Sequence, residues 1–193
     1  MKKHWNNIIR KITLLLVLLA MVGCQQMSER EIDLSAGING GFEVSKNSLP
    51  VNWLIYSPNT VPTGKFEIIL DKEVFKEGTQ SLKFKVKECS PSGGWHSPGI
   101  TNEFFEAGKF EGEGNYKLGF WIKNLGTKFM VKAGGVSPLE GDMKILVEGE
   151  ELIEDWKYFE YNINVPKERH LRMELNILKP GTFWIDDVQI IKI

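Results

Sequence analysis

Cysteine and histidine are scarce in this sequence, and their scarcity excludes several kinds of chemistry. The 193 residues include two cysteines and three histidines. His4, His96 and His170 lack the HxH or HxxxH spacing of a zinc site. There is no G-x-S-x-G nucleophile elbow, and Gly112 and Gly114 lack the basic residue and the helix of a phosphate loop. We therefore expect a protein that is not an enzyme.

The sequence also lacks a recognisable catalytic pair of carboxylates. Its acidic cluster consists of Glu148, Glu150, Glu151, Glu154 and Asp155. A glycosidase instead places two carboxylates at a set separation across a cleft. A run of like charges in a loop indicates a solvated surface.

The N-terminal apolar run is too short to cross a membrane. It extends from Ile12 to Val22, whereas a transmembrane helix needs roughly 20 residues. Its length is that of a signal-peptide core, and the residues before it form a basic leader. The leader carries Lys2, Lys3, Arg10 and Lys11.

The apolar run ends in Met21-Val22-Gly23-Cys24, which resembles the lipobox of bacterial lipoproteins. In that family the chain is cut before the cysteine, the sulfur is diacylated and the new amino terminus is acylated. Several acyl chains anchor a protein stably where one alone is marginal. The resemblance implies a signal peptide over residues 1–23, a lipid anchor at Cys24 and a place on a membrane of the cell envelope, the outer one in a diderm cell. An uncleaved anchor and an ordinary secretory signal are the alternatives.

Cleavage before Cys24 changes the charge balance, and acylation of Cys24 leaves Cys89 as the one free cysteine. Residues 1–23 contain four of the 24 basic residues and none of the 25 acidic ones, so the mature chain carries 20 against 25, a net charge of −5. A nucleic-acid ligand calls for a basic face, so we expect none. Cys89 has no partner for an intrachain disulfide, and we expect a buried, inert thiol.

Residues 24–37 are polar and without periodicity, which indicates a flexible tether. From residue 38 to residue 193, Gly, Pro and Asn separate short β-rich runs, and we expect one domain there. The predicted strands are 65–71, 81–87, 116–123, 128–133, 143–147, 156–163, 171–178 and 183–191.

Several of these runs alternate between apolar and polar residues. Leu82, Phe84 and Val86 are separated by lysines, and the runs 116–123 and 171–178 follow the same period. Period-two patterning with one polar face predicts antiparallel sheets that are buried on one side. The fold class predicted is all-β, a sandwich of two antiparallel sheets.

Six short motifs occur in an order that resembles a known family. They are Asn39-Gly40-Gly41-Phe42-Glu43, Pro50-Val51-Asn52-Trp53, Gly78-Thr79-Gln80-Ser81-Leu82, the strand Tyr116–Lys123, Trp156-Lys157-Tyr158-Phe159 and the segment Gly181–Val188. This order is similar to that of the carbohydrate-binding modules of families four and nine, which are galactose-binding-like jelly rolls. The resemblance covers roughly residues 38–193 and implies a jelly-roll β-sandwich that binds an oligo- or polysaccharide.

Asp186 is a candidate metal ligand. Strict alternation places it in an apolar row with Trp184, Val188 and Ile190, and a buried carboxylate needs a partner. The family resemblance implies a structural calcium ion held by Glu43 and Asp186, with main-chain oxygens between Gly78 and Ser81. Calcium takes six to eight oxygen ligands. A β-bulge that turns Asp186 outward, or a carboxylate that accepts backbone N–H bonds, is the alternative.

Aromatic residues matter because sugar-binding modules stack sugar rings on them. The family resemblance assigns Trp53, Trp156 and Trp184 to the core. Trp95 lies in a Gly/Pro/Ser loop, either folded over other loop residues or displayed to a ligand. Trp121 falls on the polar side of its strand.

We therefore expect the ligand-binding residues to be Trp95, Trp121, Tyr56, Arg172, Glu174 and Asn176. The hypothesis places a glycan across the sheet face that bears Trp121, with Trp95 closing over it. An ordinary solvated face is the alternative for Arg172, Glu174 and Asn176.

Two functions remain from the sequence. One is a membrane-anchored carbohydrate-binding lipoprotein that holds glycan near the cell for import or for glycan-processing partner proteins. The other is an envelope interaction or assembly lipoprotein that binds another protein through the same jelly roll. Exposure of Trp95 and Trp121 in an open groove would favour the first.

Overall fold

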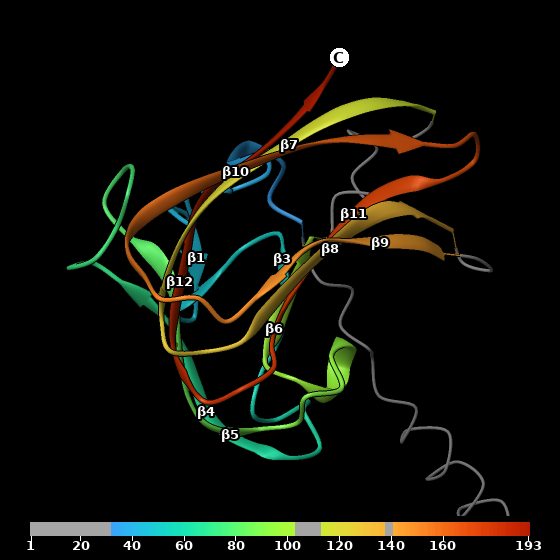
Figure 1. Cartoon of the computed structure of the whole chain (residues 1–193). Coiled ribbons are helices and arrows are strands. Elements are labelled where there is room, and N and C mark those ends of the chain that lie inside the picture. The colour runs from blue at the N-terminus through green and yellow to red at the C-terminus, as the bar shows by residue number, and fades with distance from the viewer. Residues whose placement is uncertain (1–31, 103–112, 138–140) are drawn as a thin grey trace, which may run out of the picture. The chain divides into compact units, whose positions relative to one another are not determined.

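The computed structural model describes residues 32–102, 113–137 and 141–193. These residues form a small hairpin, β1-β2, and two five-stranded antiparallel sheets (Figure 1). The first sheet has the order β10-β7-β12-β5-β4, and the second has the order β3-β6-β11-β8-β9. The strands are β1 (Ser45–Lys46), β2 (Leu49–Pro50), β3 (Trp53–Tyr56), β4 (Gly64–Asp71), β5 (Ser81–Cys89), β6 (Gly99–Asn102), β7 (Gly114–Leu125), β8 (Phe129–Val136), β9 (Gly141–Gly149), β10 (Ile153–Val165), β11 (His170–Ile177) and β12 (Gly181–Lys192).

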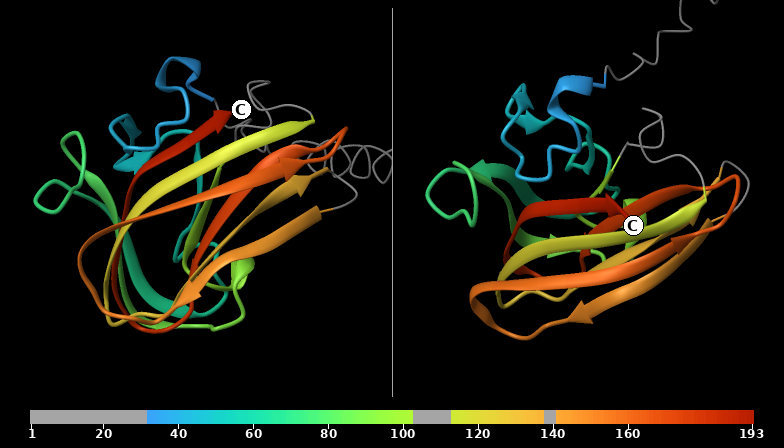
Figure 2. Two further views of the ribbon diagram at one scale, coloured as in Figure 1. Left: turned by 45° about the horizontal axis from the view of Figure 1, so that its top comes forward. Right: turned by 90° about the horizontal axis from the view of Figure 1, so that it is seen from above.

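The core lies between the two sheets because each strand turns its apolar side chains inward. On β7, Tyr116, Leu118, Phe120 and Ile122 are all fully buried. Phe183 of the first sheet contacts a phenylalanine of the second sheet with 5.1 Å between ring centroids. Each such ring stabilises the fold by about 1.5–3 kcal/mol when it leaves water. The prediction of an all-β sandwich is confirmed, and Figure 2 shows the two layers from two sides.

Eight strands lie where the alternation predicts them, and each matches its predicted run to within a few residues. The four that the sequence did not predict are β1, β2, β3 and β6, which have two to four residues each. Runs this short show too little alternation to stand out from a loop. Two 3₁₀ helices were missed as well, η1 (Leu34–Ala36) and η2 (Gly94–His96).

The domain begins at Ile32, earlier than expected. Asn52 explains the difference, because its Nδ2 donates to the carbonyls of Asp33 and Gly37 and its Oδ1 accepts from the Asp33 N–H at 2.9 Å. The Asp33 carboxylate in turn caps η1 by accepting from the N–H of Ser35. The last residues of the predicted tether are therefore part of the domain.

The predicted signal peptide and Cys24 lie outside the described residues, so the lipid anchor stays a prediction. Within residues 32–102, 113–137 and 141–193, no helix is long and apolar enough to cross a bilayer.

Strand β12 corrects the expected alternation around Asp186. The pairing with β7 shifts register between Asp186 and Gln189, and Asp187 has a φ of +46°. This is a β-bulge. It puts Phe183 and Ile185 in the core before the irregularity, with Val188 and Ile190 after it. Trp184 and Asp186 lie on the outer side of the sheet instead, although both are buried there.

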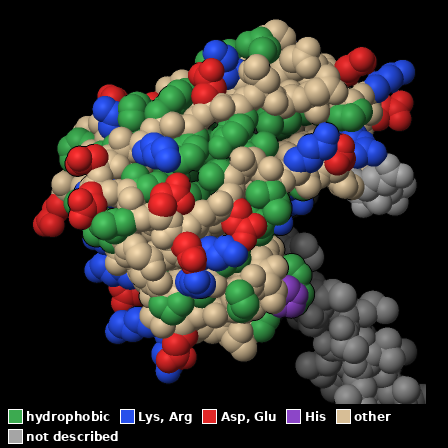
Figure 3. Space-filling view, viewed as in Figure 1, with side chains coloured by type: hydrophobic (Ala, Val, Ile, Leu, Met, Phe, Trp, Pro, Cys, Tyr) green, Lys and Arg blue, Asp and Glu red, His purple; other side chains and the backbone are tan. Residues whose placement is uncertain are grey.

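Charges of both signs are mixed on the face seen in Figure 3. Lys/Arg and Asp/Glu side chains alternate there around a band of hydrophobic side chains. Such a mixture gives this face no strong electrostatic potential of one sign.

Candidate functional site

A tyrosine and a glutamate that are far apart in the sequence meet on the outer side of the second sheet. The apolar residues of β11 point into the core, so Arg172, Glu174 and Asn176 point away from it. Tyr56 of β3 donates its hydroxyl to Glu174 Oε2 at 2.9 Å. The intervening strand has Gly99 at this point, where a Cβ atom would lie 3.0 Å from the Tyr56 ring. The missing side chain of Gly99 lets the ring reach across β6.

We call this surface the β11 face. It consists of Tyr56, Lys132, Arg172, Glu174 and Asn176, with the loop that carries Trp95 at one end.

Burial and the Glu174 carboxylate keep the Tyr56 hydroxyl protonated. Burial and the Glu174 carboxylate raise the pKa of Tyr56 well above its usual range, while the charge of Arg172 acts in the opposite direction. Lys132 Nζ lies 2.8 Å from Glu174 Oε1, so the carboxylate binds a tyrosine on one oxygen and an ammonium on the other. Tyr56 and Glu174 are nearly buried and bind each other, so the half-buried Lys132 and Arg172 are the groups of this row that a ligand can reach.

Asn176 fixes the loop that presents Trp95. Its Oδ1 accepts from the Gly94 N–H at 2.9 Å, and its Nδ2 donates to the Gly94 carbonyl at 3.0 Å. Gly93 and Gly94 have φ values of +74° and +57°, which glycine adopts without strain. Trp95 remains 57% exposed and contacts His96, with 3.8 Å between ring centroids and 33° between the ring planes. Because Asn176 itself is fully buried, its role is to position Trp95 and not to touch a ligand.

Trp121 lies on the other side of the sandwich. It belongs to β7 of the first sheet, and its register neighbours are Asp186 and Tyr158. Its ring centroid is 5.0 Å from that of Tyr158, and Lys76 Nζ lies 4.5 Å from it. The structure therefore does not place Trp121 and Trp95 in one groove. Alternation shows that Trp121 leaves the core, but it does not show into which sheet β7 is built.

The other predicted ligand-binding residues do gather on the β11 face: Tyr56, Arg172, Glu174, Asn176 and Trp95. Sequence reasoning missed Lys132 and His96. The alternation of 128–133 places Lys132 on the polar side of its strand, but nothing local indicates that this strand pairs with β11. His96 directly follows Trp95, and only the turn of η2 brings the two rings together.

The predicted calcium ligands flank the loop between β4 and β5. Asp186 Oδ2 accepts from the N–H groups of Lys76 and Glu77 at 2.7 and 3.1 Å. Burial raises the pKa of Asp186 to about 6, although these bonds and the one from the Asp187 N–H act to lower it. Both alternatives raised for Asp186, the bulge and the backbone N–H bonds, are what the structure shows.

Glu43 binds the same loop two residues further on. Its Oε1 accepts from the N–H groups of Thr79 and Gln80, and a Cβ atom on Gly78 would lie 2.1 Å from this oxygen. Ser81 faces elsewhere and donates its hydroxyl to a carbonyl of the loop at 2.6 Å.

This arrangement does not form the oxygen cage of a calcium ion, because N–H donors face both carboxylates. Among the described residues, no cluster of three or more His, Cys, Asp or Glu could hold a metal. The calcium ion stays a prediction, and it requires the loop to turn carbonyl oxygens toward Glu43 and Asp186.

Comparisons with known proteins bear on the fold. No family model and no curated protein match the sequence. The xylan-binding CBM22-1 domain of Paenibacillus barcinonensis Xyn10C matches with a TM-score of 0.57 and 11% identity, over 79% of this chain and 91% of that one. The fold of the described residues therefore resembles the jelly-roll β-sandwich of carbohydrate-binding modules.

Two further solved structures show the same similarity of fold. The C-terminal family 22 module of Clostridium thermocellum Xyn10B, whose cleft residues were studied in ligand binding, matches with a TM-score of 0.54 and 13% identity over 79% of this chain and 91% of that one. TmCBM61 in complex with β-1,4-galactotriose matches with 0.50 and 20% over 80% and 96%. These similar structures are modules of families 22 and 61, and membership of family four or nine stays a prediction.

Proposed function

We propose that this protein is a non-catalytic carbohydrate-binding lipoprotein and that its glycan lies along the β11 face. The observation that carries the proposal is Trp95, an aromatic side chain that is 57% exposed on a loop fixed beside a row of charged and polar groups. An exposed indole on a rigid support has the geometry to stack on a sugar ring. Arg172 and Lys132, which are half-buried, supply hydrogen bonds to the sugar, and Tyr56 and Glu174 hold Lys132 in position.

Stacking supplies most of the affinity in this account. Each sugar hydroxyl exchanges a hydrogen bond to water for one to protein, a net gain of about 0.5–1.5 kcal/mol. The apolar face of the sugar gains by leaving water against Trp95. We expect a dissociation constant on the order of micromolar to millimolar, or about −8 to −4 kcal/mol.

A lipid anchor would place this weak glycan binding at the cell envelope. Lipidation at Cys24 would hold the domain on a membrane of the cell envelope, where a weak module can retain polymer by repeated contacts. A glycan held there is available for import or for glycan-processing partners.

A glycan array with the mature chain tests the proposal, followed by calorimetry on the oligosaccharide that binds. Trp95→Ala should abolish binding and leave the melting temperature nearly unchanged, because the ring is largely outside the core. Trp121→Ala is the matched control and should bind as the wild type does. Loss of binding in Trp121→Ala alone would move the glycan to the first sheet. An array without a positive glycan would favour the alternative, an envelope lipoprotein that binds another protein.

A further inference from the structure

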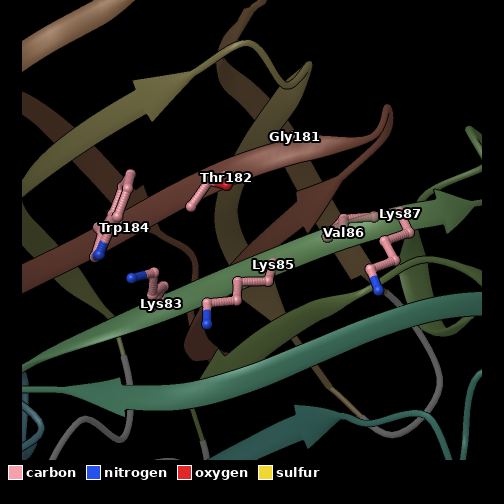
Figure 4. A pocket seen from close by; sticks show the side chains of 7 residues that line it. All are labelled: Lys83, Lys85, Val86, Lys87, Gly181, Thr182 and Trp184. Atoms are coloured by element: carbon pink, nitrogen blue, oxygen red, sulfur yellow. The ribbon is translucent and has the colours of Figure 1, made fainter.

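A groove of about 430 Å³ lies on the outer side of the first sheet, away from the β11 face. Strands β5 and β12 form its floor, and Figure 4 shows the side chains that line it. They are Lys83, Lys85, Val86, Lys87, Gly181, Thr182 and Trp184. The groove is shallow and open to solvent, and its volume lies within the range of about 300–1,000 Å³ for small-ligand sites.

The three lysines line the groove because of the alternation of β5. Leu82, Phe84 and Val86 are buried in the core, so the intervening lysines point outward. The three ammonium groups therefore lie on one face of a single strand. One acidic side chain cannot pair with all three.

One end of the groove is rigid and already neutral. Lys83 Nζ lies 2.6 Å from Asp71 Oδ2 and 4.8 Å from the centre of the Trp184 ring. Trp184 Nε1 donates to the same carboxylate oxygen at 2.9 Å. These contacts bury Asp71 and Trp184 and fix one wall.

The other end of the groove carries two exposed lysines. Lys85 and Lys87 are exposed, and within the described parts of the chain neither forms an ion pair. Glu67 lies opposite Lys85 in the register with β4, and Lys65 takes the other nearby acid, Glu88, at 2.7 Å. Lys85 and Lys87 thus face solvent, on a chain whose net charge after the predicted cleavage is −5.

We propose that this groove binds a uronic acid residue of a polysaccharide. The carboxylate would lie between Lys85 and Lys87, where charge-assisted hydrogen bonds are strong, and the Thr182 hydroxyl and the Trp184 edge would face the sugar ring. The groove carries three lysines, one of them paired with Asp71, which is fewer than the roughly four to eight basic residues of a cluster that binds an anionic membrane. The inference rests on the proposed function in taking the ligand to be a saccharide, but it concerns a second, independent site.

Calorimetry with two acidic probes tests the groove: trigalacturonate and a xylo-oligosaccharide that bears glucuronic acid. Their neutral controls are the methyl ester of the first and the unsubstituted form of the second. Wild-type protein should bind an acidic probe at least tenfold more tightly than its neutral control, and more weakly as salt rises. Lys85→Gln/Lys87→Gln should lose this preference, whereas Lys85→Arg/Lys87→Arg and Trp95→Ala should keep it.

Several results would overturn the proposal. They are failure of both acidic probes to bind, equal binding of acidic and neutral forms, wild-type binding by the double Gln variant, or loss of acidic binding in Trp95→Ala, which would place the acid on the β11 face. Binding of phosphatidylglycerol vesicles by the wild type but not by the double Gln variant, with no preference for an acidic probe, would assign the lysines to a membrane and also overturn the proposal. If the protein still binds a neutral glycan in any of these cases, the proposed function stands.

Discussion

Asp71 shows how one buried carboxylate organises the outer side of the first sheet. Burial raises the pKa of Asp71, but the hydrogen bonds from Lys83, Trp184 and two backbone N–H groups outweigh it and hold the pKa well below its usual range. A carboxyl group whose pKa is lower in the folded state stabilises the fold above its unfolded pKa, near 4. That stabilisation is lost as the pH falls toward the folded-state pKa.

We expect Asp71→Asn to lower the free energy of unfolding at pH 7 by about 1–3 kcal/mol, since it leaves the half-buried Lys83 without its counter-charge. The difference from wild type should shrink between pH 4 and pH 2, as the unfolded wild-type carboxyl is protonated. Urea unfolding at several pH values measures both effects. Glu67→Gln, an exposed change on the same strand, is the control, and an equal effect of the two substitutions would contradict this role.

Individual residues also show where sequence reasoning was sufficient. Trp53 was expected in the core and is buried there, with its Nε1 donating to the Asn39 carbonyl at 3.1 Å. Trp184 was expected there too and is buried, but outside the space between the sheets, against Asp71 and Lys83. Alternation predicts which residues avoid water, but it cannot predict a bulge that reverses the two faces within one strand.

At the scale of elements, the loop between β4 and β5 joins the two ends of the domain. Its N–H groups bind Glu43 from the opening motif and Asp186 from the closing strand. The family resemblance predicted that these three segments meet, and they do. Whether a cation or the N–H groups join them depends on the orientation of the peptide units, which side-chain patterns do not encode.

The calcium prediction has a direct test in thermal unfolding. If calcium binds there, chelation with EDTA should lower the melting temperature, because an ion that binds only the folded state stabilises it by mass action. Asp186→Ala should remove this dependence, and Asp155→Ala, an exposed change on β10, should retain it. A melting temperature that EDTA leaves unchanged would contradict calcium binding and leave the loop N–H groups as the partners of Asp186.

At the scale of the whole molecule, the sandwich has two outer sides with different chemistry. The sequence predicted the two antiparallel sheets, since their periodicity is local. It did not predict that Trp95 and Trp121 lie on opposite sides, because strand order depends on pairings between distant segments such as β11 with β6 and β8. The candidate site was therefore predicted in its residues more fully than in its geometry.

Anchoring is also a property of the whole chain. Cys24→Ser should move the protein from the membrane fraction to the soluble fraction and abolish labelling by a fatty-acid analogue, since the acyl chains supply the membrane affinity. Cys89→Ser should leave both unchanged. A Cys24→Ser variant that stays in the membrane fraction would contradict lipidation at this position.

The central claim is that glycan binds the β11 face through Trp95, and a nuclear magnetic resonance titration tests it most directly. The isotope-labelled mature chain would be titrated with the oligosaccharide that the array identifies. The account predicts that the indole N–H of Trp95 and the backbone N–H of Gly94 shift and saturate together, while the indole signals of Trp121 and Trp184 stay in place. Saturable shifts at Trp121 with no change at Trp95 would contradict it.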